Sequence, residues 1–150
     1  MIECFTDGSY NHQTGFGAWA AIIFIKGQRF EINGTEREST HNRMEILAVI
    51  KAIDFIENKI NTLDNINIYS DSQYVINLPN RLGKFKSLNF HTKKGTEIQN
   101  IDLVKQLLQL YSKGNVTLIK VKAHQKKGED VNYNREVDKL VRKLVREASC

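Results

Sequence analysis

The sequence predicts a single α/β domain built on a five-stranded mixed sheet that is flanked by helices. Three apolar segments follow one another near the start with short turns between them, a pattern typical of an antiparallel meander. A long segment with helical spacing then separates the third strand from the fourth. A strand, a helix and a strand in this order form a right-handed crossover, so the later strands are expected to pair in parallel. We expect residues 1–150 to form one domain.

The strands are indicated by alternating or continuous apolar residues between turn signals. Phe30 and Ile32 alternate with polar residues, and Gly27 and Gln28 predict a hairpin turn before them. Asp7 and Gly8 predict a turn directly after the first strand. The expected strands are residues 2–7, 17–26, 29–34, 66–70 and 116–121.

The helices are indicated by apolar residues that recur with helical spacing. In residues 42–58 these residues cover most of the circumference, so this helix is expected to be covered on several sides. Pro79 ends a short second helix. The expected helices are residues 42–58, 72–78, 98–111 and 134–147.

The composition is that of an ordinary globular protein, with 41% hydrophobic and 26% charged residues. No apolar run reaches membrane-spanning length and the start lacks a signal pattern, which favours the cytoplasm and excludes a membrane partner. Cys4 and Cys150 form neither a disulfide framework nor a zinc pattern and are interpreted as reduced thiols.

The net charge of +5 is unevenly distributed along the chain. Lys and Arg are concentrated in residues 81–127, where Glu97 and Asp102 are the only acids. Such an excess favours a polyanionic partner, and nucleic acid is the usual one. A solvated, lysine-rich surface with no partner is the alternative.

Acidic residues stand where the predicted elements meet. Asp71 follows the fourth strand, at the edge of the sheet where open α/β sheets bind their ligands. Asp7 ends the first strand, and Glu45 lies on an otherwise apolar helix face that points to the interior. Asp138 lies near the start of the last helix. If these carboxylates converge, they repel one another unless a divalent cation binds them.

Each acid also has a purely structural interpretation. Asp7 fits a turn, and Asp71 fits the cap of the following helix. Glu45 fits a capping box with Asn42, and Asp138 fits the positive end of a helix dipole. No Lys or Arg lies in the immediate Asp7 and Asp71 motifs, however, and oxygen ligands of this kind suit Mg²⁺ or Mn²⁺. Two such ions can clamp the attacking and leaving oxygens of a phosphodiester.

Four segments in this order resemble the motifs of the type 1 ribonuclease H family, over nearly the whole chain. They are residues 5–9, 40–45, 70–75 and, as the last motif, 121–124 followed by 134–138. The resemblance implies an RNase H-like fold and an endonuclease that hydrolyses the RNA strand of RNA·DNA hybrids to 5′-phosphate and 3′-hydroxyl ends.

The resemblance also implies roles for individual residues. Asp7, Glu45, Asp71 and Asp138 would hold two Mg²⁺ ions, with Mn²⁺ as a possible substitute. His124 would assist proton transfer or product departure. The partner would be the RNA·DNA hybrid, bound by a monomer with no obligate protein partner.

Further residues are expected to bind the substrate. Asn42 and Gln73 carry amides that can recognise the 2′-hydroxyl of RNA, and Thr40 matches a position that contacts a DNA-strand phosphate. Residues 81–95 resemble the basic protrusion of bacterial members, and Phe85 there either contacts sugars or covers the helices beneath it. The remaining expected contacts are Gly8, Ser9, Tyr10, His41, Lys84, Lys86, Lys93 and Lys94.

The chain departs from the family pattern at three places. His41 stands where Asn is usual, Ala123 replaces a glycine, and the protrusion lacks tryptophan. Two alternatives therefore stay open: a non-catalytic module of the same fold that binds hybrid or double-stranded RNA, and a related DNA-directed phosphotransferase. Retention of all four acids disfavours the first, and Asn42 and Gln73 disfavour the second.

Overall fold

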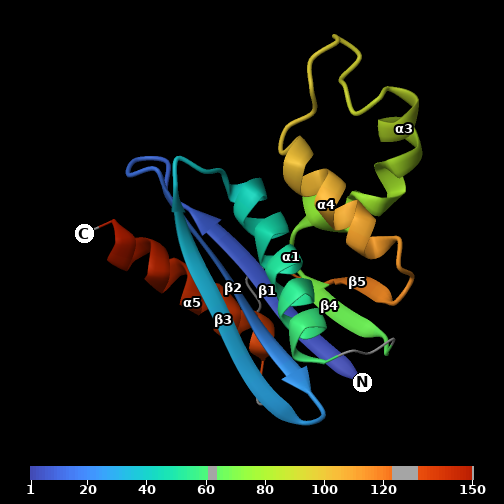
Figure 1. Ribbon diagram of the computed structural model, residues 1–150. Helices are drawn as coiled ribbons and strands as arrows, with labels where there is room; N and C mark the ends of the chain where they lie inside the picture. The colour runs from blue at the N-terminus through green and yellow to red at the C-terminus, as the bar shows by residue number, and fades with distance from the viewer. Residues whose placement is uncertain (61–63, 123–131, 150) are drawn as a thin grey trace.

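The computed structural model describes residues 1–60, 64–122 and 132–149 and contains the expected five-stranded mixed sheet (Figure 1). The strands lie in the order β3-β2-β1-β4-β5. β1, β2 and β3 are antiparallel, whereas β4 pairs in parallel with β1, and β5 with β4. The strands are β1 (Ile2–Tyr10), β2 (Phe16–Ile25), β3 (Gln28–Arg37), β4 (Ile66–Ser70) and β5 (Val116–Lys120).

Two turns differ from the sequence expectation. The hairpin turn between β2 and β3 is formed by Lys26 and Gly27, both with positive φ, so it lies one residue earlier than predicted. The turn expected at Asp7 and Gly8 is wrong, because β1 continues to Tyr10 and stays paired with β2 throughout. Long-range strand pairing therefore overrides a local turn preference here.

The long helix α1 (His41–Lys59) begins directly after its cap, Thr40, whose hydroxyl accepts a hydrogen bond from the Arg43 N–H at 3.0 Å. The other helices are α2 (Gln73–Asn77), α3 (Leu82–Ser87), α4 (Ile101–Tyr111) and α5 (Tyr133–Ala148), with a 3₁₀ turn at Pro79–Arg81. Helix α3 was not expected. Helix α4 begins three residues later than predicted, because Asn100 before it is in the left-handed conformation.

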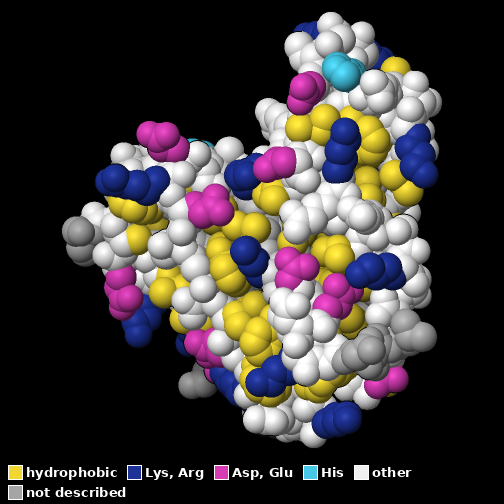
Figure 2. All heavy atoms as spheres, viewed as in Figure 1, with side chains coloured by type: hydrophobic (Ala, Val, Ile, Leu, Met, Phe, Trp, Pro, Cys, Tyr) yellow, Lys and Arg dark blue, Asp and Glu magenta, His cyan; other side chains and the backbone are white. Residues whose placement is uncertain are grey.

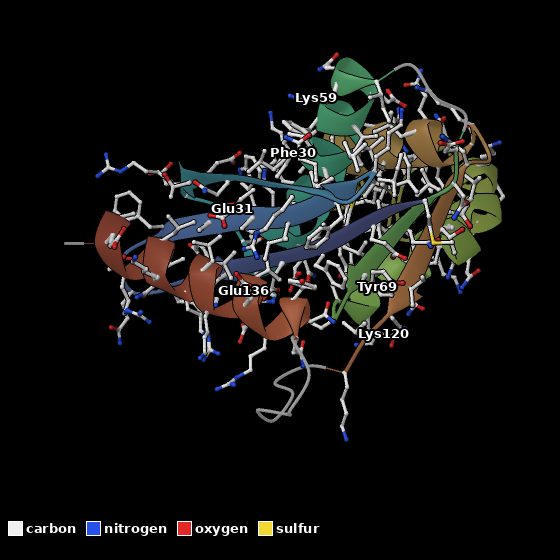
Figure 3. All side chains as sticks on the ribbon, turned by 90° about the horizontal axis from the view of Figure 1, so that it is seen from below. Phe30, Glu31, Lys59, Tyr69, Lys120 and Glu136 are labelled. Atoms are coloured by element: carbon white, nitrogen blue, oxygen red, sulfur yellow. The ribbon has the colours of Figure 1, made fainter. Side chains whose placement is uncertain are left out.

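The helices cover both faces of the sheet. Helix α1 packs against one face and α4 packs on α1, while α5 crosses β1 and β2 on the opposite face (Figure 3). The larger core lies under α1 and includes Met44, Ile50 and Ile53. A smaller core joins α5 to the other face of β2 through residues such as Val141 and Ile22. Strand β2 is apolar along its length because both of its faces are covered.

Residues 79–98, here called the basic lobe, project from the body of the protein (Figure 1). Lys and Arg side chains lie on its surface in the space-filling view (Figure 2). Phe85 anchors the lobe, since it is 4% exposed and packs with Phe90 at a ring distance of 5.8 Å. None of the described helices is long and apolar enough to cross a membrane.

Candidate active site

The pairing between β1 and β4 brings Asp7 and Asp71 to the same edge of the sheet. The last parallel pair joins Phe5 to Tyr69, and each aspartate lies two residues beyond its member of that pair. Because side chains alternate between the faces of a strand, this register directs Asp7 to the face that Phe5 occupies and places Asp71 just past the end of β4. The Thr6 hydroxyl also bonds to the Tyr69 carbonyl, at 3.4 Å.

Glu45 reaches this edge because α1 packs directly onto β1 at Gly8. A Cβ atom at position 8 would lie 2.4 Å from the Met44 carbonyl carbon and 2.5 Å from the Glu45 nitrogen. Both neighbours are helix backbone, which cannot give way locally. Only glycine therefore permits this contact, and Gly8 positions Glu45 beside Asp7 rather than only offering its backbone to a substrate.

The structural alternatives for three acids can now be assessed. Ser72, and not Asp71, caps α2 by accepting a hydrogen bond from the Val75 N–H at 3.2 Å. Thr40 caps α1, so Asn42 and Glu45 do not form the capping box considered from the sequence. Asp7 lies inside a strand, where its Oδ1 accepts a bond from the Gly8 N–H at 2.9 Å. These carboxylates are not explained by capping or turn formation.

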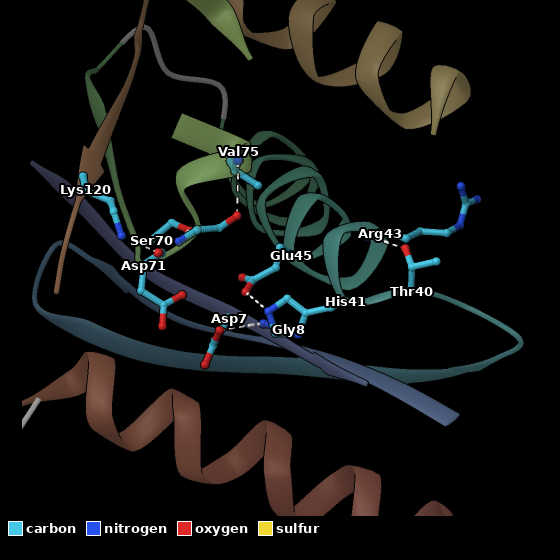
Figure 4. A network of polar contacts seen from close by, with 11 residues as sticks. Asp7, Gly8, Thr40, His41, Arg43, Glu45, Ser70, Asp71, Val75 and Lys120 are labelled. Carbon is cyan, nitrogen blue, oxygen red and sulfur yellow. Dashed lines mark hydrogen bonds and ion pairs between the residues drawn. The ribbon is translucent and has the colours of Figure 1, made fainter. Parts of the chain in front are cut away.

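Asp7, Glu45 and Asp71 form a compact cluster in which one carboxylate oxygen of each lies within 4.8 Å of the others (Figure 4). Asp7 is 4% exposed and Glu45 is 3% exposed. Burial, followed by the negative charges of Glu45 and Asp71, raises the pKa of Asp7 to about 10. Burial also raises the pKa of Glu45, which the hydrogen bond from His41 opposes. The metal-free cluster therefore disfavours its own ionisation.

The cluster fits a divalent cation. Its donors are oxygens, and Glu45 Oε2 is buried with no hydrogen-bond partner among the described residues. A buried acceptor left without a donor is costly, and a cation supplies the missing partner. A hard ion such as Mg²⁺ is the type of ion that such oxygens prefer.

Basic partners are distributed unequally around the acids. In the described residues no Lys or Arg forms an ion pair with the carboxylates of Asp7 or Asp71, as the sequence suggested. Asp138 instead pairs with Arg142, one turn later on α5, and lies outside the compact cluster. The Lys120 ammonium binds the backbone carbonyl of Asp71 rather than its carboxylate.

Two adjoining hollows of about 330 and 280 Å³ open at this edge. The residues that line both of them are Asp7, Asp71, Asp138 and Arg142. The larger hollow also brings together five of the twelve substrate contacts expected from the sequence, namely Gly8, Ser9, His41, Asn42 and Gln73. Asp138 thus borders the same hollows although it stands apart from the other three acids.

Other expected contacts lie elsewhere. Thr40 is exposed at the start of α1, and Tyr10 lines a separate shallow hollow with His12 and Arg146. Phe85 is buried in the core, as expected if it covers the helices beneath it, and its expected sugar contact stays a prediction. Lys84, Lys86, Lys93 and Lys94 are exposed on the basic lobe. His124 and Ala123 lie outside the described residues.

Sequence reasoning missed three residues that border the acids. Arg142 could have been found from its spacing of four residues after Asp138 on one helix face. Asn134 and Lys122 line the smaller hollow, and the Asn134 amide oxygen is buried without a hydrogen-bond partner in the described part of the chain. Both lie in the segments 121–124 and 134–138 that resemble the last family motif, but residue type and spacing alone do not distinguish them from ordinary loop or helix-start residues.

Fold and site together define a class of protein, an α/β domain with a carboxylate cluster at the edge of a mixed sheet that could hold a metal ion. The chain matches the family model described as RNase H over residues 1–146. Ribonuclease H of Thermoanaerobacter sp. is 36% identical over 148 residues, which cover 97% of this chain and 90% of that protein. Ribonuclease H of Francisella philomiragia is 35% identical over 147 residues, which cover 97% of this chain and 91% of that protein. The chain belongs to the RNase H family and is a ribonuclease H enzyme.

Solved structures support the fold. The crystal structure of LC9-RNase H1, described as a type 1 RNase H with the type 2 active-site motif, aligns with a TM-score of 0.78 at 21% identity, covering 97% of this chain and 72% of that one. A foamy viral protease-reverse transcriptase in complex with dsDNA aligns with a TM-score of 0.72 at 18% identity. The alignment covers 99% of this chain and 93% of that one. At these identities the likeness concerns the fold alone.

Proposed function

We propose that this protein hydrolyses the RNA strand of RNA·DNA hybrids with two divalent cations and leaves 5′-phosphate and 3′-hydroxyl ends. The observation that carries the proposal is the convergence of three carboxylates from β1, α1 and the end of β4, with one buried oxygen that has no hydrogen-bond partner in the described part of the chain. A non-catalytic binding module would have no use for such a cluster, because negative charge repels the phosphates it would have to bind. Membership of the RNase H family supports the same reading.

Asp7, Glu45 and Asp71 would hold the cations, and Asp138 would complete the set. The natural ion is proposed to be Mg²⁺, with Mn²⁺ able to replace it. When bound, the ions supply a nucleophilic water and stabilise the oxygen that leaves. The protein's own contribution is rigidity, since strand pairing and the contact at Gly8 fix the directions of the carboxylates.

Recognition of RNA is assigned to polar groups that line the larger hollow. The Gln73 amide donates to Asn77 at 2.8 Å, and Gln73 lines this hollow, where its carbonyl oxygen would serve as an acceptor for a 2′-hydroxyl. Asn42 lines the same hollow and offers a donor and an acceptor. The lysines of the basic lobe would bind backbone phosphates at a distance from the reaction. His124 stays a proposal for proton transfer or product release.

The chain is also proposed to act as a monomeric, single-domain enzyme of the cytoplasm. In the described residues all strands form one sheet, and Met1 is the only large hydrophobic residue that is exposed.

The test is cleavage of four end-labelled substrates, namely the hybrid, duplex RNA, duplex DNA and single-stranded RNA, with Mg²⁺ and with excess chelator. We expect cutting of the hybrid's RNA strand alone and no cutting in chelator. Product RNA should accept a 5′ label from a kinase only after phosphatase treatment, since it should already carry a 5′-phosphate. Full activity in chelator, or cutting of duplex DNA, would contradict the proposal.

A further inference from the structure

His41 lies directly beside the acidic cluster at the first position of α1 (Figure 4). Its Nε2 is 2.8 Å from Glu45 Oε1, although 58% of the His41 side chain is exposed and only 3% of the Glu45 side chain is. The two residues are four apart, so they share one face of the helix. The exposed ring therefore covers the solvent side of a buried carboxylate.

The two oxygens of Glu45 have different surroundings. Oε1 is bound by His41, whereas Oε2 is buried without a hydrogen-bond partner in the described residues and belongs to the carboxylate that joins Asp7 and Asp71 in the cluster. A side chain held through one oxygen loses rotational freedom about its terminal bond. The other oxygen is then kept in a fixed direction.

We propose that His41 is a positioning residue that orients Glu45 so that its unpaired oxygen faces the cation site. This inference rests on the proposed metal-dependent function and adds a role beyond the substrate contact expected of this position. An imidazole with its proton on Nε2 donates to Oε1 without needing a positive charge. The bond can therefore persist when a cation binds the other oxygen, and an outer hydrogen-bond partner of this kind strengthens ligation.

The opposite role for the same contact is to hinder metal binding. A protonated imidazole would compete with an arriving cation, and its removal would then tighten metal binding. The two roles predict opposite signs for the same measurement. Metal affinity without substrate therefore separates them.

The experiment is calorimetric titration of Mn²⁺ into the metal-free full chain and three variants. We expect His41→Ala to weaken Mn²⁺ binding about tenfold, the lower end of the range for such outer partners. His41→Gln should restore most of this loss, because its amide donates a hydrogen bond at similar reach. His91→Ala, a histidine of the basic lobe that bonds the Asn89 carbonyl, should bind like the unchanged protein.

A second readout uses hybrid cleavage. The Mg²⁺ concentration for half-maximal rate should rise in His41→Ala by a factor similar to the loss in Mn²⁺ affinity, with little change in KM for the hybrid at saturating Mg²⁺. Circular dichroism melting in chelator checks that each variant is folded at the assay temperature. A structural defect alone would not be rescued specifically by Gln.

The outcomes separate cleanly. Unchanged or tighter Mn²⁺ binding by His41→Ala overturns the positioning role, even if the unchanged protein cuts hybrids. A raised KM with unchanged metal affinity also overturns it and leaves His41 as a substrate contact. If the unchanged protein neither binds Mn²⁺ nor cuts hybrids, the proposed function fails as well.

Discussion

The acidic cluster and the basic lobe carry opposite charges and are built in opposite ways. The cluster places Asp7 and Glu45 on long, buried elements, where strand pairing and close packing fix the backbone. The lobe presents Lys84 and Lys93 from a short helix and a loop, where both are exposed to solvent. The difference shows that the groups proposed to act on one bond are held rigidly, whereas the groups proposed to attract a flexible polyanion are free to follow it.

The two regions also differ in what they cost the fold. Buried like charges oppose folding unless they are protonated or bound to a cation, which is why the pKa of Asp7 is raised. Exposed lysines keep their hydration and add little penalty. Variants in the cluster should therefore change chemistry and metal-linked stability, and variants in the lobe should change affinity.

The largest expected effect is on the reaction rate and lies in the cluster. Asp71→Asn should reduce hybrid cleavage at saturating Mg²⁺ by about a thousandfold or more, because loss of a ligand removes several kcal/mol of transition-state stabilisation. Hybrid binding in chelator should change little. Single-turnover cleavage and filter binding measure the two quantities.

Asp138→Asn is the matched variant, because Asp138 borders the same hollows but stands outside the compact cluster. Its loss of rate should be at least about tenfold smaller than that of Asp71→Asn, since an amide oxygen can still serve at a peripheral position. Equal losses would show that all four acids contribute alike.

The next effect concerns the anchor of the lobe. Phe85→Ala should lower the free energy of unfolding by about 3 kcal/mol, as expected when a buried aromatic ring is removed. Phe90→Ala, at a half-buried ring that stacks on it, should cost less. Urea denaturation measures both values. A stable Phe85→Ala protein with a raised KM would instead assign Phe85 to the substrate.

The third effect is on stability as pH changes, without metal. The folded pKa of Asp7, about 10, exceeds its unfolded value, so the folded state binds the extra proton. The stability tied to this proton is complete below the unfolded pKa near 4 and is lost as the pH rises towards 10, at no more than about 1.4 kcal/mol per pH unit. Asp7→Asn should therefore stabilise the metal-free protein at pH 8 by about 1–3 kcal/mol.

Asp102→Asn provides a control of opposite sign, because the hydrogen bond from Arg43 lowers the pKa of Asp102. The Arg43–Asp102 pairing stabilises the folded state above the unfolded pKa of Asp102, and this contribution is lost on acidification. Asp102→Asn should therefore lower the free energy of unfolding at pH 8. Denaturant unfolding in chelator at pH 5.5 and pH 8 gives the Asp7 slope, and further measurements below about pH 4, the unfolded pKa of Asp, give the loss of the Asp102 contribution. Adding Mg²⁺ should stabilise the unchanged protein more than Asp7→Asn. If metal-free Asp7→Asn is no more stable than the unchanged protein at pH 8, something other than protonation of Asp7 offsets the buried negative charge of the cluster.

The smallest effect is expected in the lobe. The double change Lys84→Ala and Lys86→Ala should raise KM several-fold and reduce the slope of log affinity against log salt by about one for each lost phosphate contact. The maximal rate should not change. Lys51→Ala, an exposed lysine on α1, is the control. An unchanged salt slope in the double variant would remove the lobe from the binding surface.

The order of elements was predictable because periodicity reports burial directly. The five strands, the crossover and the long helix follow from where apolar residues recur in the sequence. Element ends were less predictable. Strand β1 runs through Asp7 and Gly8 since β2 pairs with it, and no local rule reports a partner that lies ten or more residues away.

The site was predictable in its residue types but not in its partnerships. The carboxylates Asp7, Glu45 and Asp71 could be nominated from their positions at the ends and interior faces of elements. A helix-start role for the Thr40 hydroxyl could be considered from the sequence, whereas capping of α2 by Ser72 instead of Asp71 was not evident, because acids and hydroxyls fit a cap equally well. The pairing of His41 with Glu45 depends on side-chain direction at a helix start, which composition and spacing leave open.

The alignment of β1 with β4 has a further consequence for how this enzyme can fail. A shift of one residue between the two strands would move Asp71 about 3.3 Å along the strand direction relative to Asp7. It would also turn the side chains of β4 to the opposite face of the sheet. Such a misfolded chain would retain a sheet, helices and near-normal circular dichroism. It would nevertheless have lost the carboxylate cluster, so inactive protein is the expected product of register errors between β1 and β4.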